Sequence, residues 1–287
     1  MATFKHISSK NADYGAAEQY LTFEHDEFTM KPTLDENGRL MLREDYRIAT
    51  LNCGGEDFAV ACMRSNLRYG KNQKREDVKS HHYIISFDPR DAVDNGLTVD
   101  RAQALGEEFC RKQFPGHQAI VCTHPDGHNH SGNIHVHIVI NSLRIAEVPF
   151  LPYMDRPADT RAGCKHRCTD AAMEYFKAEV MELCHRENLY QIDLLHGSKN
   201  RITEREYWAQ RKGQAKLDEK AAALPAGEQP AKSTKFETDK EKLRQTIRAA
   251  LSSAASYDEF AAVLLQQGVT VKESRGRLSY LTPDRTK

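Results

Sequence analysis

The stretch HPDGHNHSGNIHVHIVIN, residues 124–141, holds five of the thirteen histidines of the chain within eighteen residues. In its second half, His135 and His137 stand two residues apart in an apolar run. Residues i and i+2 of a β-strand point to the same face, so a strand here directs both imidazoles to one side and Val136 to the other, toward a core. Because buried imidazoles without partners are costly, the spacing predicts a strand whose histidine face holds a metal ion.

A third ligand is expected from the preceding strand. Residues 118–123, QAIVCT, form a short apolar run that delivers His124 at its end, and the polar segment 125–133 predicts a turn back into the histidine strand. His124 and the pair on the antiparallel neighbour would make a three-imidazole site with open positions for a substrate. His128 and His130, in the turn, are alternative third ligands.

Composition limits the class of protein. The 287 residues are enough for two structural units, and 41 Lys and Arg balance 41 Asp and Glu, so the net charge is zero. This is not the overall charge of a nucleic-acid binder, and any basic surface must be local. The seven scattered cysteines fit a reducing cytoplasm better than a disulfide framework. The N-terminus has no apolar signal segment and no run is long enough to span a membrane, which predicts a cytoplasmic protein without membrane insertion.

The remaining pattern alternates strands with helices. We expect strands at 3–8, 82–87, 118–123 and 134–140, and helices at about 14–23, 56–69, 98–114 and 170–188. These elements indicate an α/β (α+β) fold with a central, mostly antiparallel sheet flanked by helices. The predicted domain covers residues 1–220, followed by a linker at 221–233 and a partial, mostly helical region at 234–287 with a hairpin around 274–276.

The residues alone leave the reaction open. A metal on three histidines can polarise a phosphoryl or carbonyl oxygen, or activate water. Tyr20, in AAEQYLTFEHDE, is able to attack a phosphodiester when the charge that develops on the phosphate is neutralised. Tyr14 is the competing tyrosine, and an ordinary half-buried aromatic is the simpler explanation of either one.

A resemblance narrows these choices. The run HPDGHNHSGNIHVHIVIN resembles the histidine motif of conjugative relaxases, in the relaxase/mobilization nuclease group of the HUH endonuclease superfamily, and is similar to relaxases of Firmicute conjugative transposons of the vancomycin-resistance type. HHYIISFDP, residues 81–89, resembles the strand before that motif, and AAEQYLTFEHD, residues 16–26, sits where the family has its nucleophilic tyrosine. The resemblance covers about residues 1–220 and implies an HUH-type domain, and the tail resembles the helical region that follows in these proteins. The turn after His124 is longer than in many relatives, which leaves His128 and His130 open as ligands.

The resemblance implies a mechanism. His124, His135 and His137 would bind a divalent metal, Mg2+ or Mn2+ in the cell, whereas three imidazoles favour Zn2+, Ni2+ or Co2+ in a purified sample. Tyr20 would attack the scissile phosphate of single-stranded or hairpin transfer-origin DNA. The products would be a 5′-phosphotyrosyl link and a free 3′-OH, and the reverse attack would rejoin the strand after transfer.

Other residues would support this reaction. Asp126 would orient a ligand histidine or help to deprotonate the tyrosine, and Asn141 would hold substrate or a ligand. Phosphate contacts are expected from the basic residues of one segment, which are Arg64, Arg68, Lys71, Lys74, Arg75 and Lys79. A second candidate group is Arg161, Lys165, His166 and Arg167.

The expected partners beyond DNA are an accessory relaxosome protein and the type IV coupling and secretion machinery, with export to the recipient cell alongside the DNA.

Three alternatives remain: a rolling-circle replication initiator of the same superfamily, a metal-dependent nuclease that uses activated water, and a DNA-binding accessory protein with a structural metal. A Tyr20→Phe substitution separates the water-using nuclease from a relaxase, which would lose cleavage. The water-using nuclease keeps its activity in this variant, and the accessory protein binds DNA without nicking it.

Overall fold

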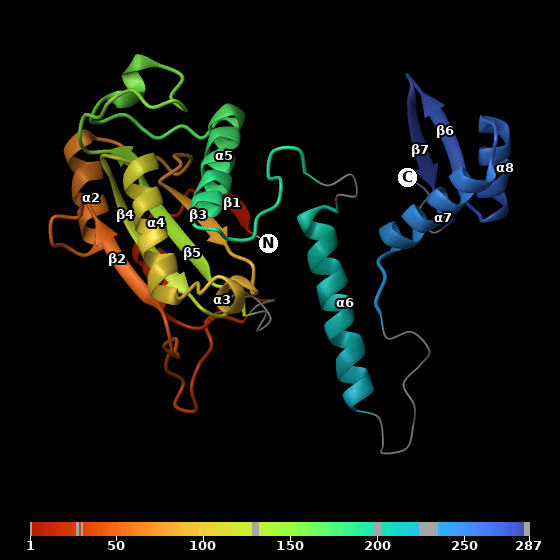
Figure 1. The fold of residues 1–287 in the computed structure, drawn as a ribbon, viewed down its shortest axis with the longest axis horizontal. Coiled ribbons are helices and arrows are strands. Elements are labelled where there is room, and N and C mark those ends of the chain that lie inside the picture. Colours follow the sequence, from red (N-terminus) through yellow and green to blue (C-terminus); the bar gives the residue numbers. More distant parts are fainter. Residues whose placement is uncertain are drawn as a thin grey trace. The chain divides into compact units, whose positions relative to one another are not determined.

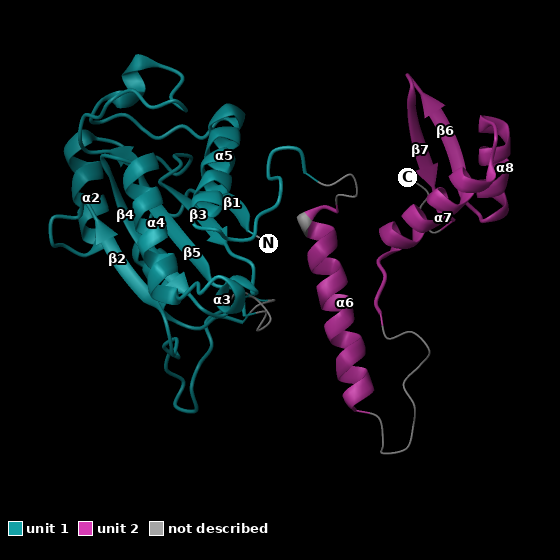
Figure 2. Ribbon diagram, viewed as in Figure 1, with its two compact units in different colours: residues 1–197 teal, residues 198–287 magenta. Residues whose placement is uncertain are grey.

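The computed structural model of the chain describes residues 2–26, 29, 31–127, 132–197, 202–223 and 235–283. The chain forms two compact units, residues 1–197 and 198–287 (Figure 2). The unit with the histidine strand thus ends before the helix at 204–222. The boundary expected at residue 220 stays a prediction, and most of the expected linker at 221–233 lies outside the described residues.

The first unit is built on a five-stranded sheet (Figure 1). Its strands are β1 (Thr3–Ser9), β2 (Arg47–Leu51), β3 (Ser80–Ser86), β4 (His117–His124) and β5 (His135–Arg144). They lie in the order β1-β3-β5-β4-β2, and every neighbouring pair is antiparallel. The central strands β4 and β5 are buried along their whole length. The predicted α+β class with a mostly antiparallel sheet is confirmed.

Helices cover both faces of this sheet. The helices of the unit are α1 (Gly15–Thr22), α2 (Phe58–Tyr69), α3 (Asp91–Asp94), α4 (Val99–Gln113) and α5 (Asp170–Arg186). Val136 and Ile138 of β5 lie in the core shared with α4 and α5, whereas Val139 lies in the core shared with α1 and α2. Because side chains alternate along a strand, the histidine face of β5 is the face toward α1 and α2, as its alternation predicted.

The edge strand β2 was not predicted. It pairs with β4, and its sequence RIATL alternates between partly buried and exposed residues. A short strand with one exposed face and a single apolar run of two residues gives a weak signal. The other expected elements of this unit are present, with boundaries shifted by one or two residues at most ends.

Residues 23–26 and 31–43 form an arm between α1 and β2. Single bridges pair Phe23 with Leu42 and Leu34 with Leu40. At the tip, the Asp35 side chain accepts hydrogen bonds from the backbone of the turn, which Gly38 completes at φ 74°. The arm returns at Arg43, whose backbone N–H donates to the Thr22 carbonyl at 3.0 Å. Both ends of the arm therefore meet at the C-terminal end of α1.

The second unit contains helices and a hairpin. Its elements are α6 (Glu204–Ala222), α7 (Asp239–Ser253), α8 (Tyr257–Gln266), β6 (Thr270–Ser274) and β7 (Arg277–Leu281). Ala250, Phe260, Leu264 and Val269 form a small core between α7, α8 and the β6–β7 hairpin. The hairpin expected around 274–276 is present as the β6–β7 pair. Across the described part of the chain, no helix combines the length and apolar character needed to cross a membrane.

Candidate active site

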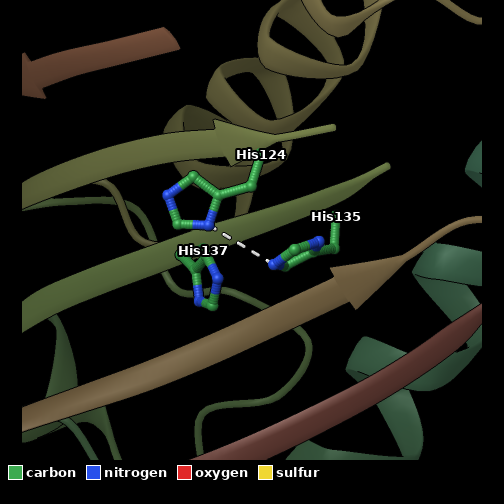
Figure 3. A group of neighbouring side chains, drawn as sticks. All are labelled: His124, His135 and His137. Carbon is green, nitrogen blue, oxygen red and sulfur yellow. Dashed lines mark hydrogen bonds between the residues drawn. The ribbon is translucent and has the colours of Figure 1, made fainter. Parts of the chain in front are cut away.

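Three histidines meet at one end of the β4–β5 ladder (Figure 3). His124 ends β4 and lies directly opposite His135, which begins β5, and His137 follows on the same face. One ligand nitrogen from each of the three lies within 4.8 Å of the others. The structure therefore brings together the three residues predicted as ligands. The alternatives His128 and His130 lie outside the described residues.

Backbone carbonyls determine how His124 and His135 face each other. His124 Nε2 lies 2.7 Å from the Leu21 carbonyl oxygen, which only accepts, so the proton is on Nε2 and the Nδ1 lone pair is free. His135 Nδ1 lies 3.3 Å from the Asn133 carbonyl oxygen, which leaves its Nε2 unprotonated by the same argument. These two lone-pair nitrogens are 3.4 Å apart (Figure 3). Two imidazole nitrogens at this separation can both bind one cation, so the donor set fits a metal ion.

A fourth histidine stands behind the triad. His82 of β3 places Nε2 at 2.8 Å from His137 Nδ1, and the two ring centroids are 5.0 Å apart. With the proton on His137 Nδ1, the Nε2 atom of that residue keeps its lone pair for a metal. A ligand imidazole whose second nitrogen is hydrogen-bonded is better oriented and more basic. The sequence analysis missed His82, although strand alternation places it on the histidine face, opposite Val139.

Burial keeps these imidazoles neutral. Burial, and next the charge of Arg43, lower the pKa of His124 to about 3. Burial lowers the pKa of His82 to about 4, and burial followed by the neighbouring histidines holds the pKa of His137 well below its usual value. Neutral imidazole is the form that binds metal. The cluster is therefore ready to accept a cation at neutral pH.

Tyr20 of α1 lies against this cluster. Its ring centroid is 5.9 Å from that of His137 and 6.2 Å from that of His82. Burial raises the pKa of the Tyr20 phenol, and the positive charge of Arg43 opposes this shift. The tyrosine predicted as the nucleophile is thus adjacent to the residues predicted as metal ligands.

Tyr14 occupies a different environment. The residue is 4% exposed, and its hydroxyl lies 3.0 Å from the Lys79 carbonyl oxygen and 3.2 Å from Asn141 Oδ1. The same hydroxyl accepts a hydrogen bond of 2.8 Å from Asn66 Nδ2. Burial raises the pKa of the Tyr14 phenol. Its hydroxyl is therefore committed to a buried polar network that ties the start of α1 to α2 and β5.

Asn141 belongs to that network. Its Nδ2 donates to Gln118 Oε1 at 3.1 Å, and its Oδ1 accepts from the Leu143 N–H at 3.2 Å. Asn141 shares the histidine face of β5, but four residues of strand separate it from His137 by about 13 Å. The structure does not bring Asn141 to the triad.

Asp126 is joined to Arg43, a residue that the sequence analysis missed. Asp126 follows His124 by two residues, and its Oδ2 accepts from Arg43 Nη1 at 3.1 Å. The Arg43 side chain is 14% exposed and that of Asp126 52% exposed. Within the described ranges, no hydrogen bond joins Asp126 to a triad histidine. An arginine in a polar arm gives no sequence signal, because only the fold places it beside α1 and β4.

The predicted phosphate contacts differ in accessibility. Arg64, Arg68, Lys71, Lys74 and Arg75 are exposed, and Arg64 pairs with Glu56. Lys79 is 4% exposed, and its ammonium donates to the Lys74 carbonyl oxygen at 2.6 Å. The structure thus places Lys79 in the interior of its own loop and not on the surface where DNA would bind.

The second basic group is also divided. His166 is buried, with Nε2 at 2.7 Å from the Tyr83 hydroxyl. Lys165 pairs with Asp77, and Arg167 pairs with Asp155, each at 3.4 Å. Arg161 is exposed. Three of the four positions are therefore already engaged within the protein.

The first unit thus combines an antiparallel sheet, three histidines from two adjacent strands and a tyrosine from a helix. Residues 40–148 match the family model described as "Relaxase: MobA/VirD2-like, nuclease domain". This match bears out the resemblance of the histidine segment to the nuclease domain of relaxases.

The chain is also similar to three proteins that have been described. The chain is 27% identical over 225 residues to Protein rlx of Staphylococcus aureus, covering 78% of this chain and 52% of that protein. The chain thus spans about half the length of this curated relative. A structure described as "Molecular Basis of Vancomycin Resistance Transfer in Staphylococcus aureus" aligns with a TM-score of 0.40 and 13% identity, over 71% of this chain and 97% of that one. The metal-bound complex of the conjugative relaxase TrwC with oriT DNA aligns with a TM-score of 0.36 and 12% identity, over 93% of this chain and 99% of that one.

Proposed function

We propose that this protein is a site- and strand-specific DNA transesterase that nicks single-stranded transfer-origin DNA in conjugative transfer. The observation that carries the proposal is the contact of the Tyr20 ring with His137, within a triad whose lone pairs converge. The nuclease family of residues 40–148 supports it, and the metal-bound TrwC structure, a conjugative relaxase with oriT DNA, is similar to this chain.

His124, His135 and His137 would hold one divalent cation. Mg2+ or Mn2+ is expected in the cell, and Zn2+, Ni2+ or Co2+ in a purified sample. When bound, the ion supplies positive charge at the scissile phosphate. His82 orients His137 from behind, and the Leu21 carbonyl orients His124.

Tyr20 would supply the nucleophile. Its phenol loses a proton, and its oxygen forms a bond to phosphorus while the bond from phosphorus to the 3′ oxygen of the preceding nucleotide breaks. That 3′ oxygen takes up a proton and leaves as a 3′-OH. One phosphodiester replaces another, so the reverse attack by a 3′-OH rejoins the strand and frees Tyr20.

Tyr14 and Asn141 would position Tyr20. Their shared hydrogen bond of 3.2 Å joins the residue before α1 to β5, the strand that carries two of the three triad histidines. Because Tyr20 lies within the same short helix, fixing the start of the helix limits the positions that the Tyr20 side chain can reach. This is a different role from the substrate or ligand contact expected for Asn141.

The exposed basic residues Arg64, Arg68, Lys71, Lys74 and Arg75 would contact DNA phosphates. The further partners that we propose are an accessory relaxosome protein and type IV coupling and secretion machinery. In this proposal the protein acts in the bacterial cytoplasm and is exported to the recipient cell with bound DNA.

The test is a covalent-complex experiment. The protein, Tyr20→Phe and Tyr14→Phe are incubated with Mn2+ and a labelled oligonucleotide that spans the transfer origin of the element, and are resolved on a denaturing gel. We expect a metal-dependent protein–DNA band that Tyr20→Phe lacks and Tyr14→Phe retains. A band that survives in Tyr20→Phe contradicts the nucleophile assignment.

Cleavage without any band favours a nuclease that uses water, and DNA binding without cleavage favours an accessory protein. A band on a replication origin, with none on the transfer origin, favours a rolling-circle initiator.

A further inference from the structure

We propose that Arg43 binds the scissile phosphate and is a catalytic residue of this site. The inference rests on the proposed function and adds to it a charge built into the protein, in addition to any metal on the histidines.

The backbone places Arg43 between the two parts of the active site. Its N–H donates to the Thr22 carbonyl at 3.0 Å, two residues after Tyr20. Its guanidinium bonds Asp126 at 3.1 Å, two residues after His124. The backbone of Arg43 is thus bonded to the end of α1, the helix that carries Tyr20. Its guanidinium is bonded to the segment that follows β4, the strand that ends at His124. A phosphate that reacts with Tyr20 next to the triad must come close to this side chain.

The guanidinium has donor capacity that the protein leaves unused. The Arg43 side chain is 14% exposed, and its Nε atom is buried without a hydrogen-bond partner among the described residues. A guanidinium presents five N–H donors in a rigid planar fork, and a buried donor without an acceptor is unfavourable. A phosphate oxygen satisfies such a donor, and the planar fork matches two oxygens of one phosphate. The unpaired Nε therefore indicates an anionic ligand rather than a purely structural arginine.

The charge of Arg43 acts on the residues around the proposed reaction. It opposes the rise that burial causes in the pKa of the Tyr20 phenol, so the guanidinium lies within electrostatic range of that hydroxyl. A positive charge at this range also stabilises the negative charge that gathers on a phosphate attacked by that hydroxyl. Asp126 is about half exposed, so its carboxylate can turn toward water when a phosphate takes its place on Arg43.

A binding experiment tests the contact without relying on catalysis. In the Tyr20→Phe background and in EDTA, fluorescence anisotropy compares an oligonucleotide with a native scissile phosphate and one with a methylphosphonate there, which lacks the negative charge. We expect the neutral linkage to weaken binding about 10- to 100-fold when Arg43 is present, the range for a hydrogen bond to a charged group. With Arg43→Gln added, the two oligonucleotides should bind within about two-fold of each other, the usual margin for uncoupled sites.

Arg39→Gln is the matched control, because Arg39 is an exposed arginine of the same arm. It should leave the full effect of the methylphosphonate. Circular dichroism checks that Arg43→Gln is folded. Arg43→Lys, which keeps the charge but not the fork, should retain a reduced effect, and it replaces Arg43→Gln in the comparison if that variant does not fold.

Two different failures are distinguishable. If wild-type protein forms no covalent band on the gel, the proposed function fails. If the band forms but Arg43→Gln still discriminates against the neutral linkage as strongly as its parent, the contact of Arg43 with this phosphate is refuted and the nicking reaction stands.

Discussion

His82 Nε2 lies 2.8 Å from His137 Nδ1, so the candidate ligand that contacts Tyr20 is itself held by a histidine of the adjacent strand. The pair joins two strands, because β3 carries His82 and β5 carries His137. The third strand, β4, carries the candidate ligand His124. The orientation of one imidazole therefore depends on a residue that need not contact metal or DNA.

Replacing His82 by Ala is expected to weaken metal binding about 10- to 100-fold, because a hydrogen-bonded second nitrogen fixes a ligand's orientation and raises its basicity. Isothermal titration with Mn2+ measures the effect. His25→Ala is the control, since His25 also contacts the Tyr20 ring, at 5.2 Å between centroids, but is not a member of the triad. Equal Mn2+ affinity in His82→Ala and wild type would show that His137 needs no such support.

Metal binding to the triad should stabilise the folded protein. A ligand at 100 times its Kd adds about 2.7 kcal/mol to the free energy of unfolding. Thermal melts with and without Mn2+ should therefore show a rise in Tm for wild type and none for His124→Ala or His137→Ala. A triad variant whose Tm rises as much as that of wild type would place the metal elsewhere.

Tyr14→Phe should destabilise the protein and slow covalent complex formation, because it loosens the start of α1 but leaves the Tyr20 hydroxyl in place. The change removes the acceptor of the 2.8 Å bond from Asn66 and leaves a buried donor unpaired, at a cost of about 1–3 kcal/mol. Urea unfolding measures this loss, and the denaturing gel measures covalent complex formation on the same sample below the transition. The prediction is contradicted if the folded variant forms no complex.

Stability should fall on acidification because of histidines remote from the triad. Burial, with smaller effects of His6 and Arg144, lowers the pKa of His81 and of His117 to about 3 in the folded protein. The unfolded chain titrates at the ordinary value of 6.5 and so binds more protons below it. The stabilisation is therefore complete above pH 6.5 and declines as the pH falls toward 3.

Each of these histidines contributes a slope of about 1.4 kcal/mol per pH unit within this window. Urea unfolding of metal-free protein at pH 7, 6 and 5 determines the total slope. A His81→Gln variant should show a slope smaller by the contribution of one histidine. If stability falls with the same slope in wild type and in His81→Gln, His81 is not neutral in the folded state.

Substitutions of Lys71 and Lys79 are expected to affect different properties, DNA binding for Lys71 and stability for Lys79. Lys71 is exposed, so Lys71→Ala should reduce the slope of log K against log salt for single-stranded DNA by about 0.7, the value for one phosphate contact. Lys79 is buried with its ammonium on a backbone carbonyl, so Lys79→Ala should lower stability and leave the salt slope unchanged. A reduced slope in Lys79→Ala alone would reverse this assignment.

Periodicity and local chemistry made much of the site predictable. His135 and His137 could be placed on one face because strand spacing leaves no other choice, and His124 followed from the turn that joins two apolar runs. Arg43 could not be found this way, because its position depends on where a polar arm returns. Alternation gives the face of His82 within its own strand, but the pairing of β3 with β5 is needed to place it beside His137. Lys79 shows the converse limit, since a basic residue in a basic segment is indistinguishable by composition from its exposed neighbours.

The direct pairing of His124 with His135 also divides the sequence into parts that tolerate change differently. A change of length after Asp126 and before Asn133 would leave every residue of β4 and β5 opposite the same partner. A one-residue shift within β5 would instead turn its histidines into the aromatic core beneath α4 and α5. The number of residues between Asp126 and Asn133 can therefore change without moving the histidines of β4 and β5 off their shared face.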